Sequence, residues 1–163
     1  MGQIACSPMC AIAVGQRIRV QQDLALTKAK LQDLEPLEFW EKRAEYWVNR
    51  YVRLRDRDAG CISCDKPATW GGQWHCSHFR SVGAASAVRF HLWNMHKSCS
   101  ECNRHKSGNL SEYEPRLRAK IGDDRVDWLR TQNQVTKRTR EYLQRLRDVF
   151  AKRCRRLERR LKA

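Results

Sequence analysis

The spacing of apolar residues along the first third of the chain predicts two helices. The first covers residues 16–34, where apolar side chains are scattered among polar ones. Pro36 suits the first turn of the second helix, which should end near Asp58, just before Gly60. Apolar residues in this second segment recur at three- and four-residue steps and give it one apolar face, made of Phe39, Tyr46, Trp47, Tyr51 and Leu54.

The last third of the chain is also predicted to be helical. One short helix covers residues 110–119, and Asp123 is placed to cap the start of another. The final helix should run from about Thr136 to the end. Its apolar stripe is interrupted by Arg153 and Arg160, which argues against a long coiled coil; the stripe consists of Leu143, Leu146, Phe150 and Leu157.

The segment between these helical regions has a different character. Glycines and short polar runs divide residues 61–108, where all five histidines lie, and they predict a small hairpin, a loop and one helix. We therefore expect a mostly helical α+β protein with four parts. These parts are an irregular segment 1–15, a helical extension 16–58, a compact core 59–122 and a helical, basic region 123–163.

The charge of the chain points to a polyanionic partner. The net charge is +15 over 163 residues and the pI is about 10.0, values typical of nucleic-acid-binding proteins. Residues 137–163 contribute +9 of that charge, so we expect the last helix to lie along phosphates; the alternative is a solvated helix. No window is apolar enough to span a membrane, and no Lys or Arg precedes the mildly apolar residues 1–15 as in a signal peptide. We therefore expect a soluble, intracellular protein.

Four of the eight cysteines form two CxxC pairs, Cys61 with Cys64 and Cys99 with Cys102. Paired thiolates at this spacing suit one tetrahedral, structural Zn²⁺, which would close residues 65–98 into a rigid unit. In an intracellular basic protein a metal is a better explanation than disulfides, and the alternative is four reduced core cysteines.

The residues inside and after this unit resemble a known nuclease family. The resemblance rests on His78-Phe79-Arg80-Ser81, on Leu92 to His96, and on Cys102-Asn103-Arg104-His105-Lys106-Ser107-Gly108-Asn109. These strings resemble the NinG (Rap) family of lambdoid-phage recombination nucleases, and the order of His78, Asn94 and Asn103 resembles that of HNH (ββα-metal) nucleases. The resemblance implies that His78 is the general base, that Asn94 braces the loop that carries it, and that Asn103 binds the catalytic metal.

The chemistry of these residue types agrees with that implication. Hydrolysis of a phosphodiester needs a deprotonated water and a cation that absorbs charge. A neutral imidazole is a suitable base at pH 7, and an amide oxygen can bind Mg²⁺ or Mn²⁺. One departure stands out, because many HNH sites have Asp where this chain has Ser77. His75 shares a strand face with Ser77 and could be the missing ligand, or it could pack against tryptophan.

Several further roles are expected. The basic residues that flank the site and those on the last helix should contact phosphate; they are Arg80, Arg104, Lys106, Arg153, Arg155 and Arg156. His105 could replace Asn103 as a ligand, although contact with phosphate or solvent is the more common role of such a residue. We expect His96 to be structural and assign no function to His91. NinG-like proteins carry an N-terminal zinc-finger-like segment, of which Cys6 and Cys10 resemble the second half; the alternative is two ordinary cysteines.

The resemblance also implies a biological setting. It indicates a phage- or prophage-encoded endonuclease in the bacterial cytoplasm that cuts branched DNA, such as Holliday junctions and D-loops. Cutting both strands of a junction would suit a homodimer, and recombination proteins are possible partners. The competing hypothesis is a non-catalytic zinc module that binds DNA or a recombination partner, since a fold alone does not give a function. A zinc adaptor that binds only protein is disfavoured by the charge of +15.

Overall fold

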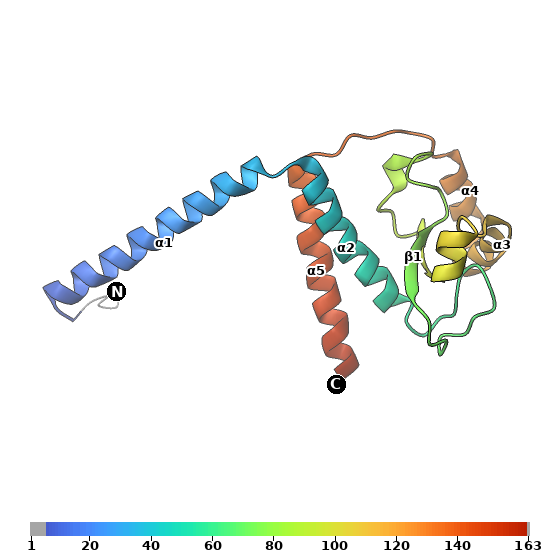
Figure 1. The fold of residues 1–163 in the computed structure, drawn as a ribbon, viewed down its shortest axis with the longest axis horizontal. Coiled ribbons are helices and arrows are strands. Elements are labelled where there is room, and N and C mark those ends of the chain that lie inside the picture. The colour runs from blue at the N-terminus through green and yellow to red at the C-terminus, as the bar shows by residue number, and fades with distance from the viewer. Residues whose placement is uncertain (1–5, 163) are drawn as a thin grey trace. The chain divides into compact units, whose positions relative to one another are not determined.

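The structure, a computed structural model, describes residues 6–162, without the side chains of residues 32 and 33. It is mostly helical with one small sheet, which confirms the predicted α+β class (Figure 1). The elements in chain order are α1 (Pro8–Leu34), α2 (Leu37–Arg55), β1 (Trp74–His78), the 3-10 turn η1 (Ser86–Val88), β2 (Met95–Cys99), the π-helical turn η2 (Glu101–His105), α3 (Leu110–Ile121), α4 (Asp123–Thr131) and α5 (Arg140–Lys162). None of these helices within residues 6–162 is both long and apolar enough to cross a membrane.

The chain divides into two units, residues 1–39 and residues 40–163. The first unit is mainly α1, which begins at Pro8. The prediction of an irregular segment 1–15 is therefore wrong for residues 8–15, and residues 1–5 lie outside the described part of the chain. The helix starts early because the Ser7 hydroxyl accepts a hydrogen bond from the Cys10 N–H at 3.2 Å and Pro8 suits the first turn. Apolar side chains point to several sides of α1 and are exposed, Leu24 by 65 % and Leu31 by 59 %.

In the second unit, α2 and α5 lie side by side and run in the same direction (Figure 1). The Cys154 thiol donates to the Trp47 carbonyl at 3.6 Å, and Arg50 Nε donates to Glu158 Oε1 at 2.9 Å. The rings of Tyr51 and Phe150 meet edge to face with centroids 5.1 Å apart. The sequence separation of the contacting residues is nearly constant, 107 for Trp47 with Cys154 and 108 for Arg50 with Glu158. A constant separation is what two parallel helices require.

The buried faces of these helices differ from the predicted ones. In α2 the buried residues recur every four positions and are Trp40, Ala44, Val48 and Val52, whereas Tyr46 of the predicted face is 51 % exposed. The helix has two neighbours, because Trp47 and Tyr51 meet α5 while other residues meet the hairpin. A single apolar face therefore cannot describe it. In α5, Leu143 and Phe150 are buried as predicted, but they are joined by Ala151 and Cys154.

Two predicted helix starts are also corrected. Helix α5 begins at Arg140 rather than near Thr136, because residues 132–139 run as a strap whose backbone is tied to η1: Thr136 N–H donates to Ser86 Oγ at 2.9 Å. Asp123 is the first residue of α4 rather than its cap, and its carboxylate pairs with Arg118 at 3.0 Å. For α5 a contact with a segment fifty residues away replaces the local signal, whereas the partner of Asp123 lies only five residues earlier, near the end of α3.

The centre of the second unit is an antiparallel hairpin. Strands β1 and β2 pair from Trp74 with Cys99 to His78 with Met95, and a long loop, residues 79–94, joins them. Side chains along β1 alternate between two faces, so Trp74, Cys76 and His78 share one face and His75 and Ser77 share the other. The apolar core lies beside this hairpin and is built from Ile62, Phe79, Ala85, Val88, Tyr113, Leu117, Val126 and Leu129.

A buried carboxylate ties α2 to the hairpin. Asp56, which directly follows α2, accepts hydrogen bonds from the Lys97 N–H at 3.1 Å and from Lys120 Nζ at 3.0 Å. Burial raises the pKa of Asp56, but the neighbouring charges of Arg55 and Lys120 outweigh it and lower the pKa from 3.8 to about 2. Arg55 also donates to the Met95 carbonyl at 2.7 Å. The end of α2 is thereby fixed against β2.

Candidate functional site

Four cysteines from three parts of the chain meet at one end of the hairpin. Cys61 and Cys64 lie in the loop after α2, Cys99 ends β2, and Cys102 lies in η2. All four sulfur atoms lie within 4.8 Å of one another, and those of Cys64 and Cys99 are 3.8 Å apart. A tetrahedral Zn²⁺ with Zn–S bonds of about 2.3 Å separates its sulfurs by roughly 3.8 Å. The cluster could therefore hold a zinc ion, as the CxxC spacing predicts.

Peptide N–H groups surround the sulfurs. The N–H groups of Ser63 and Cys99 point at Cys61 Sγ, at 3.4 and 3.2 Å, and the Cys102 N–H points at Cys99 Sγ at 3.4 Å. Such donors stabilise the negative charge of thiolates and orient them toward a metal. Lys66 Nζ lies 3.8 Å from Cys99 Sγ and adds a positive charge. The surroundings of the cluster thus suit four metal-binding thiolates.

Next to this cluster, β1 and η2 bring together three of the polar residues singled out in the sequence. The Ser77 hydroxyl donates to Asn103 Oδ1 at 2.7 Å, and Asn103 Nδ2 donates to His75 Nδ1 at 3.1 Å. Ser77 is buried and also contacts the Ser98 hydroxyl. Two amino acids of one strand face therefore converge on the side chain of Asn103.

His75 and Asn103 line an open cleft of 390 Å³. Its other wall comes from α2, which contributes Glu45, Asn49 and Arg53 at four-residue steps, and Gln73, Trp74 and Cys76 complete the lining. Asn49 Oδ1 is buried and has no hydrogen-bond partner among the described residues. An unpaired buried acceptor costs about 1–3 kcal/mol, so such an atom calls for an explanation.

His78 does not belong to the lining of this cleft. Its Nε2 lies 2.9 Å from the Arg89 carbonyl oxygen, which can only accept a hydrogen bond, so Nε2 carries the proton and Nδ1 is the unprotonated nitrogen. Burial lowers the pKa of His78. This effect is larger than the opposite effects of the Arg89 hydrogen bond and of the charge of Glu45. The imidazole is therefore neutral at pH 7. Arg89 is in turn held by Glu45 and Glu41, at 3.1 and 3.5 Å.

Asn94 ties down both ends of the loop that follows β1. Its Oδ1 accepts from the Arg80 N–H at 2.6 Å, and its Nδ2 donates to the carbonyls of Arg80 and Val88, each at 3.1 Å. Asn94 is completely buried, so these bonds are shielded from water. They hold the loop that carries the Arg89 carbonyl, and thus indirectly orient His78.

The other histidines lie apart from the cleft. His96 is 2 % exposed and its Nδ1 lies 3.2 Å from the Tyr113 hydroxyl, in keeping with a structural position. His91 packs against the rings of Trp93 and Trp128, with centroids 4.9 and 5.0 Å away. His105 and Arg104 are exposed on η2. None of these three histidines lines the cleft, whose members are named above.

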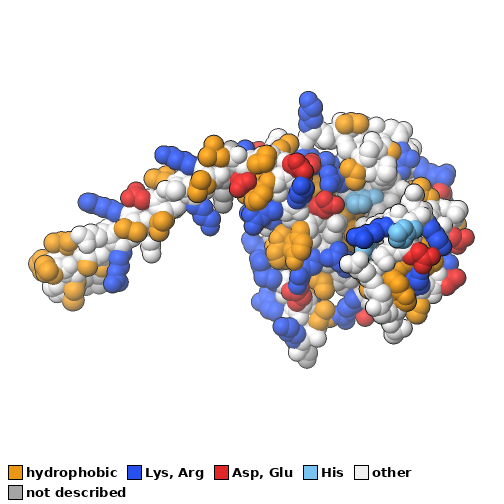
Figure 2. All heavy atoms as spheres, viewed as in Figure 1, with side chains coloured by type: hydrophobic (Ala, Val, Ile, Leu, Met, Phe, Trp, Pro, Cys, Tyr) orange, Lys and Arg blue, Asp and Glu red, His pale blue; other side chains and the backbone are white. Residues whose placement is uncertain are grey.

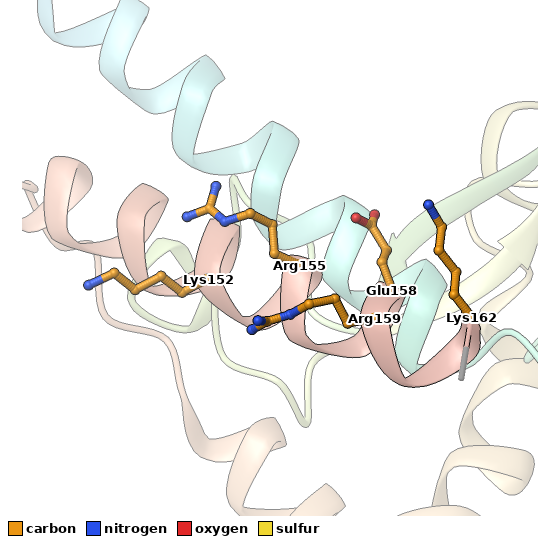
Figure 3. Close-up of a pocket in the computed structure, with 5 residues that line it drawn as sticks. All are labelled: Lys152, Arg155, Glu158, Arg159 and Lys162. Atoms are coloured by element: carbon orange, nitrogen blue, oxygen red, sulfur yellow. The ribbon is translucent and has the colours of Figure 1, made fainter.

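The basic residues predicted to contact phosphate fall into two groups. Near the hairpin, Arg80 binds the Asn133 side chain of the strap, and Lys106 pairs with Glu101 at 3.2 Å. On α5, Arg155 and Arg156 are exposed and Arg153 stacks on the rings of Phe150 and Tyr51. Figure 2 shows Lys and Arg side chains gathered over α5. A hollow of 410 Å³ on this helix is lined by Lys152, Arg155, Glu158, Arg159 and Lys162 (Figure 3).

The three cleft residues of α2 were not predicted from the sequence as part of a site. Glu45, Asn49 and Arg53 lie one turn apart on α2, where only the spacing of apolar residues was considered. The signal was present, because residues four apart on a helix share a face. The sequence does not show, however, that this face of α2 packs toward His75 rather than facing water.

Comparisons with known proteins agree with the resemblance found in the sequence. A family model described as Bacteriophage Lambda NinG protein matches residues 2–160. Protein ninG of Escherichia phage lambda is 39 % identical over 124 residues, which cover 71 % of this chain and 60 % of that protein. Protein ninG of Escherichia phage 933W is 45 % identical over 94 residues, which cover 58 % and 46 %. The chain thus spans less than two thirds of either relative, and no solved structure matches it.

Proposed function

The chain belongs to the NinG family of bacteriophage lambda, and from that membership and the geometry of its hairpin we propose that it is a metal-dependent DNA endonuclease of the HNH type. The observation that carries the proposal is the hydrogen bond from His78 Nε2 to the Arg89 carbonyl. It fixes the tautomer whose Nδ1 can accept a proton, and a general base must have such an atom.

In this mechanism His78 Nδ1 takes a proton from a water molecule, and the resulting hydroxide attacks phosphorus. The bond from phosphorus to the leaving 3′ oxygen breaks, and that oxygen takes a proton from solvent. Asn103 contacts Ser77, and His78 is the next residue of β1 on the opposite face, so the amide and the imidazole lie on the two sides of one strand end. A bound Mg²⁺ or Mn²⁺ would supply positive charge to the phosphate oxygens. His75 and Asn103 would hold that ion, and the pair Cys61/Cys64 with Cys99/Cys102 would hold structural zinc.

The substrate and the partners follow from the family rather than from the geometry. We propose branched DNA, Holliday junctions or D-loops, cut during phage recombination in the cytoplasm of the bacterial host. Two strands of a junction need two active sites, which a homodimer would provide. Recombination proteins are candidate partners.

The proposal is tested by incubating the purified, zinc-loaded protein with a linear duplex, a D-loop and a four-way junction. We expect cleavage with Mg²⁺ or Mn²⁺, none with EDTA, and recovery when Mg²⁺ is restored. Zinc content is measured before and after EDTA, so that loss of the structural metal is not mistaken for loss of the catalytic one. Tight DNA binding without cleavage in either metal would contradict the proposal.

That last outcome would favour the second candidate, a non-catalytic zinc module that binds DNA. Ser77 favours this candidate, because a hydroxyl bonded to Asn103 and Ser98 replaces the carboxylate found in many HNH sites. The structural zinc cluster and the basic helix α5 would serve a binding module equally well.

Helix α5 should contribute much of the non-specific DNA affinity under either function. The four cations that line its hollow are Lys152, Arg155, Arg159 and Lys162. We expect replacing all four by Gln to flatten the slope of log affinity against log salt by up to about 3.6, roughly 0.9 for each phosphate that the helix no longer neutralises. Substitution is preferable to deletion, because Cys154 and Glu158 hold α5 against α2. The measurement is fluorescence anisotropy with duplex DNA at several salt concentrations.

A variant with the same change in charge serves as the control. Replacing Arg17, Arg19, Lys28 and Lys30 of α1 by Gln also removes four positive charges. If both variants lower the salt slope equally, only net charge matters and the role of α5 is refuted.

A further inference from the structure

We propose that helix α2 supplies Glu45 and Asn49 as oxygen ligands to the catalytic divalent cation, completing a site that His75 and Asn103 leave unfinished. The inference rests on the proposed function, since it concerns the cation of that same site. It adds a second segment of the chain, more than twenty residues before the hairpin, to the catalytic machinery.

The ligand set from the hairpin is short of oxygen. A cation would bind His75 Nδ1 and Asn103 Oδ1 in place of the hydrogen bonds that these atoms now accept from Asn103 Nδ2 and from the Ser77 hydroxyl. The hairpin would then supply one nitrogen and one amide oxygen. Mg²⁺ and Mn²⁺ favour six ligands, mostly oxygens, and proteins usually hold them through one or two carboxylates plus water and phosphate. Glu45 is the only acidic residue among those that line the cleft. It is therefore the candidate for the missing carboxylate.

The position of Glu45 allows this role. Its Oε2 accepts from the Arg89 guanidinium at 3.1 Å, which holds the side chain in place and leaves Oε1 for another ligand. The side chain is 37 % exposed, so the carboxylate is open to the cleft rather than sealed in the core. The same Arg89 supplies the carbonyl that orients His78. One residue thus connects the proposed ligand with the proposed base.

Asn49 provides independent evidence that a ligand is missing from the cleft. It lines the cleft one turn after Glu45, yet its Oδ1 is buried without a donor among the described residues. Buried acceptors are almost always satisfied by a donor, a water molecule or a cation. A cation bound beside Glu45 would supply the partner that this oxygen lacks.

Arg53, one turn after Asn49, is the third residue of α2 that lines the cleft. Its guanidinium has no hydrogen bond or ion pair within residues 6–162. A guanidinium without a carboxylate partner is suited to a phosphate oxygen. The face of α2 therefore presents a carboxylate, an amide and a guanidinium at successive turns, an order that matches a cation followed by the phosphate it activates.

Binding of Mn²⁺ to the zinc-loaded protein without DNA tests this inference, with free Mn²⁺ followed by electron paramagnetic resonance. We expect Glu45→Gln to weaken Mn²⁺ binding about tenfold or more, because a metal site loses its carboxylate. Asn49→Asp should tighten binding, since it adds a negative charge at the same place. Glu41→Gln is the matched control: Glu41 also binds Arg89 but does not line the cleft, so its loss should leave Mn²⁺ affinity unchanged.

The outcomes separate this inference from the proposed function. Equal Mn²⁺ affinity in the parent and in Glu45→Gln would overturn the inference even if the parent cuts DNA. An equal loss in Glu41→Gln would also overturn it, because the effect would then pass through Arg89. Mn²⁺ binding that depends on Glu45 in a protein that cuts no DNA would support the site and refute the nuclease. Circular dichroism and zinc content check that every variant is folded.

Discussion

His78→Ala should abolish DNA cleavage while zinc content, folding and DNA affinity stay close to those of the parent. Loss of a positioned general base lowers the rate about 10²–10⁴-fold. The expected loss is large because Nδ1 is the free nitrogen of an imidazole whose Nε2 is fixed on the Arg89 carbonyl. The rate is measured on a branched substrate at saturating Mg²⁺ and Mn²⁺.

Two further histidine variants show whether the effect is specific. His91→Ala is the control, because His91 packs on Trp93 and Trp128 outside the cleft and its loss should leave the rate nearly unchanged. His75→Ala should lower activity in a way that a higher Mn²⁺ concentration restores, because the variant loses a ligand and keeps the base. Undiminished cleavage by His78→Ala would refute the HNH assignment.

The dependence of the parent rate on pH provides a second check on His78. Burial lowers the pKa of His78 from 6.5, and this effect is larger than the opposite effects of the hydrogen bond to the Arg89 carbonyl and of the charge of Glu45. A base must be neutral to accept a proton, so the rate should fall at acidic pH with the midpoint of that fall below pH 6.5. An acidic limb centred above pH 6.5 would argue for another base.

The second large effect concerns zinc. Cys99→Ser, or chelation of the metal, should unfold the hairpin and the segments packed on it. Structural zinc binding contributes about 10–16 kcal/mol in small domains, and a whole domain is stable by only about 5–15 kcal/mol. Loss of the ion therefore removes the margin of stability. Circular dichroism during heating, with and without chelator, measures the change.

Cys76→Ser is the matched control, because Cys76 lies on the same hairpin but outside the four-cysteine cluster. It should keep one zinc ion bound through the cluster and should keep the fold. Soluble, folded protein that contains no zinc by elemental analysis would contradict the prediction.

The cysteine cluster and the polar group around Asn103 could be predicted because they depend on short-range rules. The CxxC spacing places two sulfurs on one side of a turn, and the two-residue period of a strand places His75 and Ser77 on one face. Both rules act over a few residues, so the sequence alone is sufficient to apply them.

The features that were missed depend on contacts between distant segments. The strap at residues 132–139 stays extended because Thr136 and Arg138 bind Ser86, some fifty residues earlier. Cys154 is likewise buried against the Trp47 carbonyl, 107 residues earlier in the chain. The cleft residues of α2 belong to the same class, since nothing near Glu45 in the sequence points to His75.

The parallel pairing of α2 and α5 also sets an order of events during synthesis. Trp47 of α2 is added to the growing chain 107 residues before Cys154, its partner in α5. At about 5–20 residues per second, that interval lasts roughly 5–20 s. Until then, the side of α2 that carries Trp47 and Tyr51 has no neighbour, and a nascent chain that stops before Arg140 never acquires one. Only a chain synthesised to the end of α5 can therefore pack against both sides of α2.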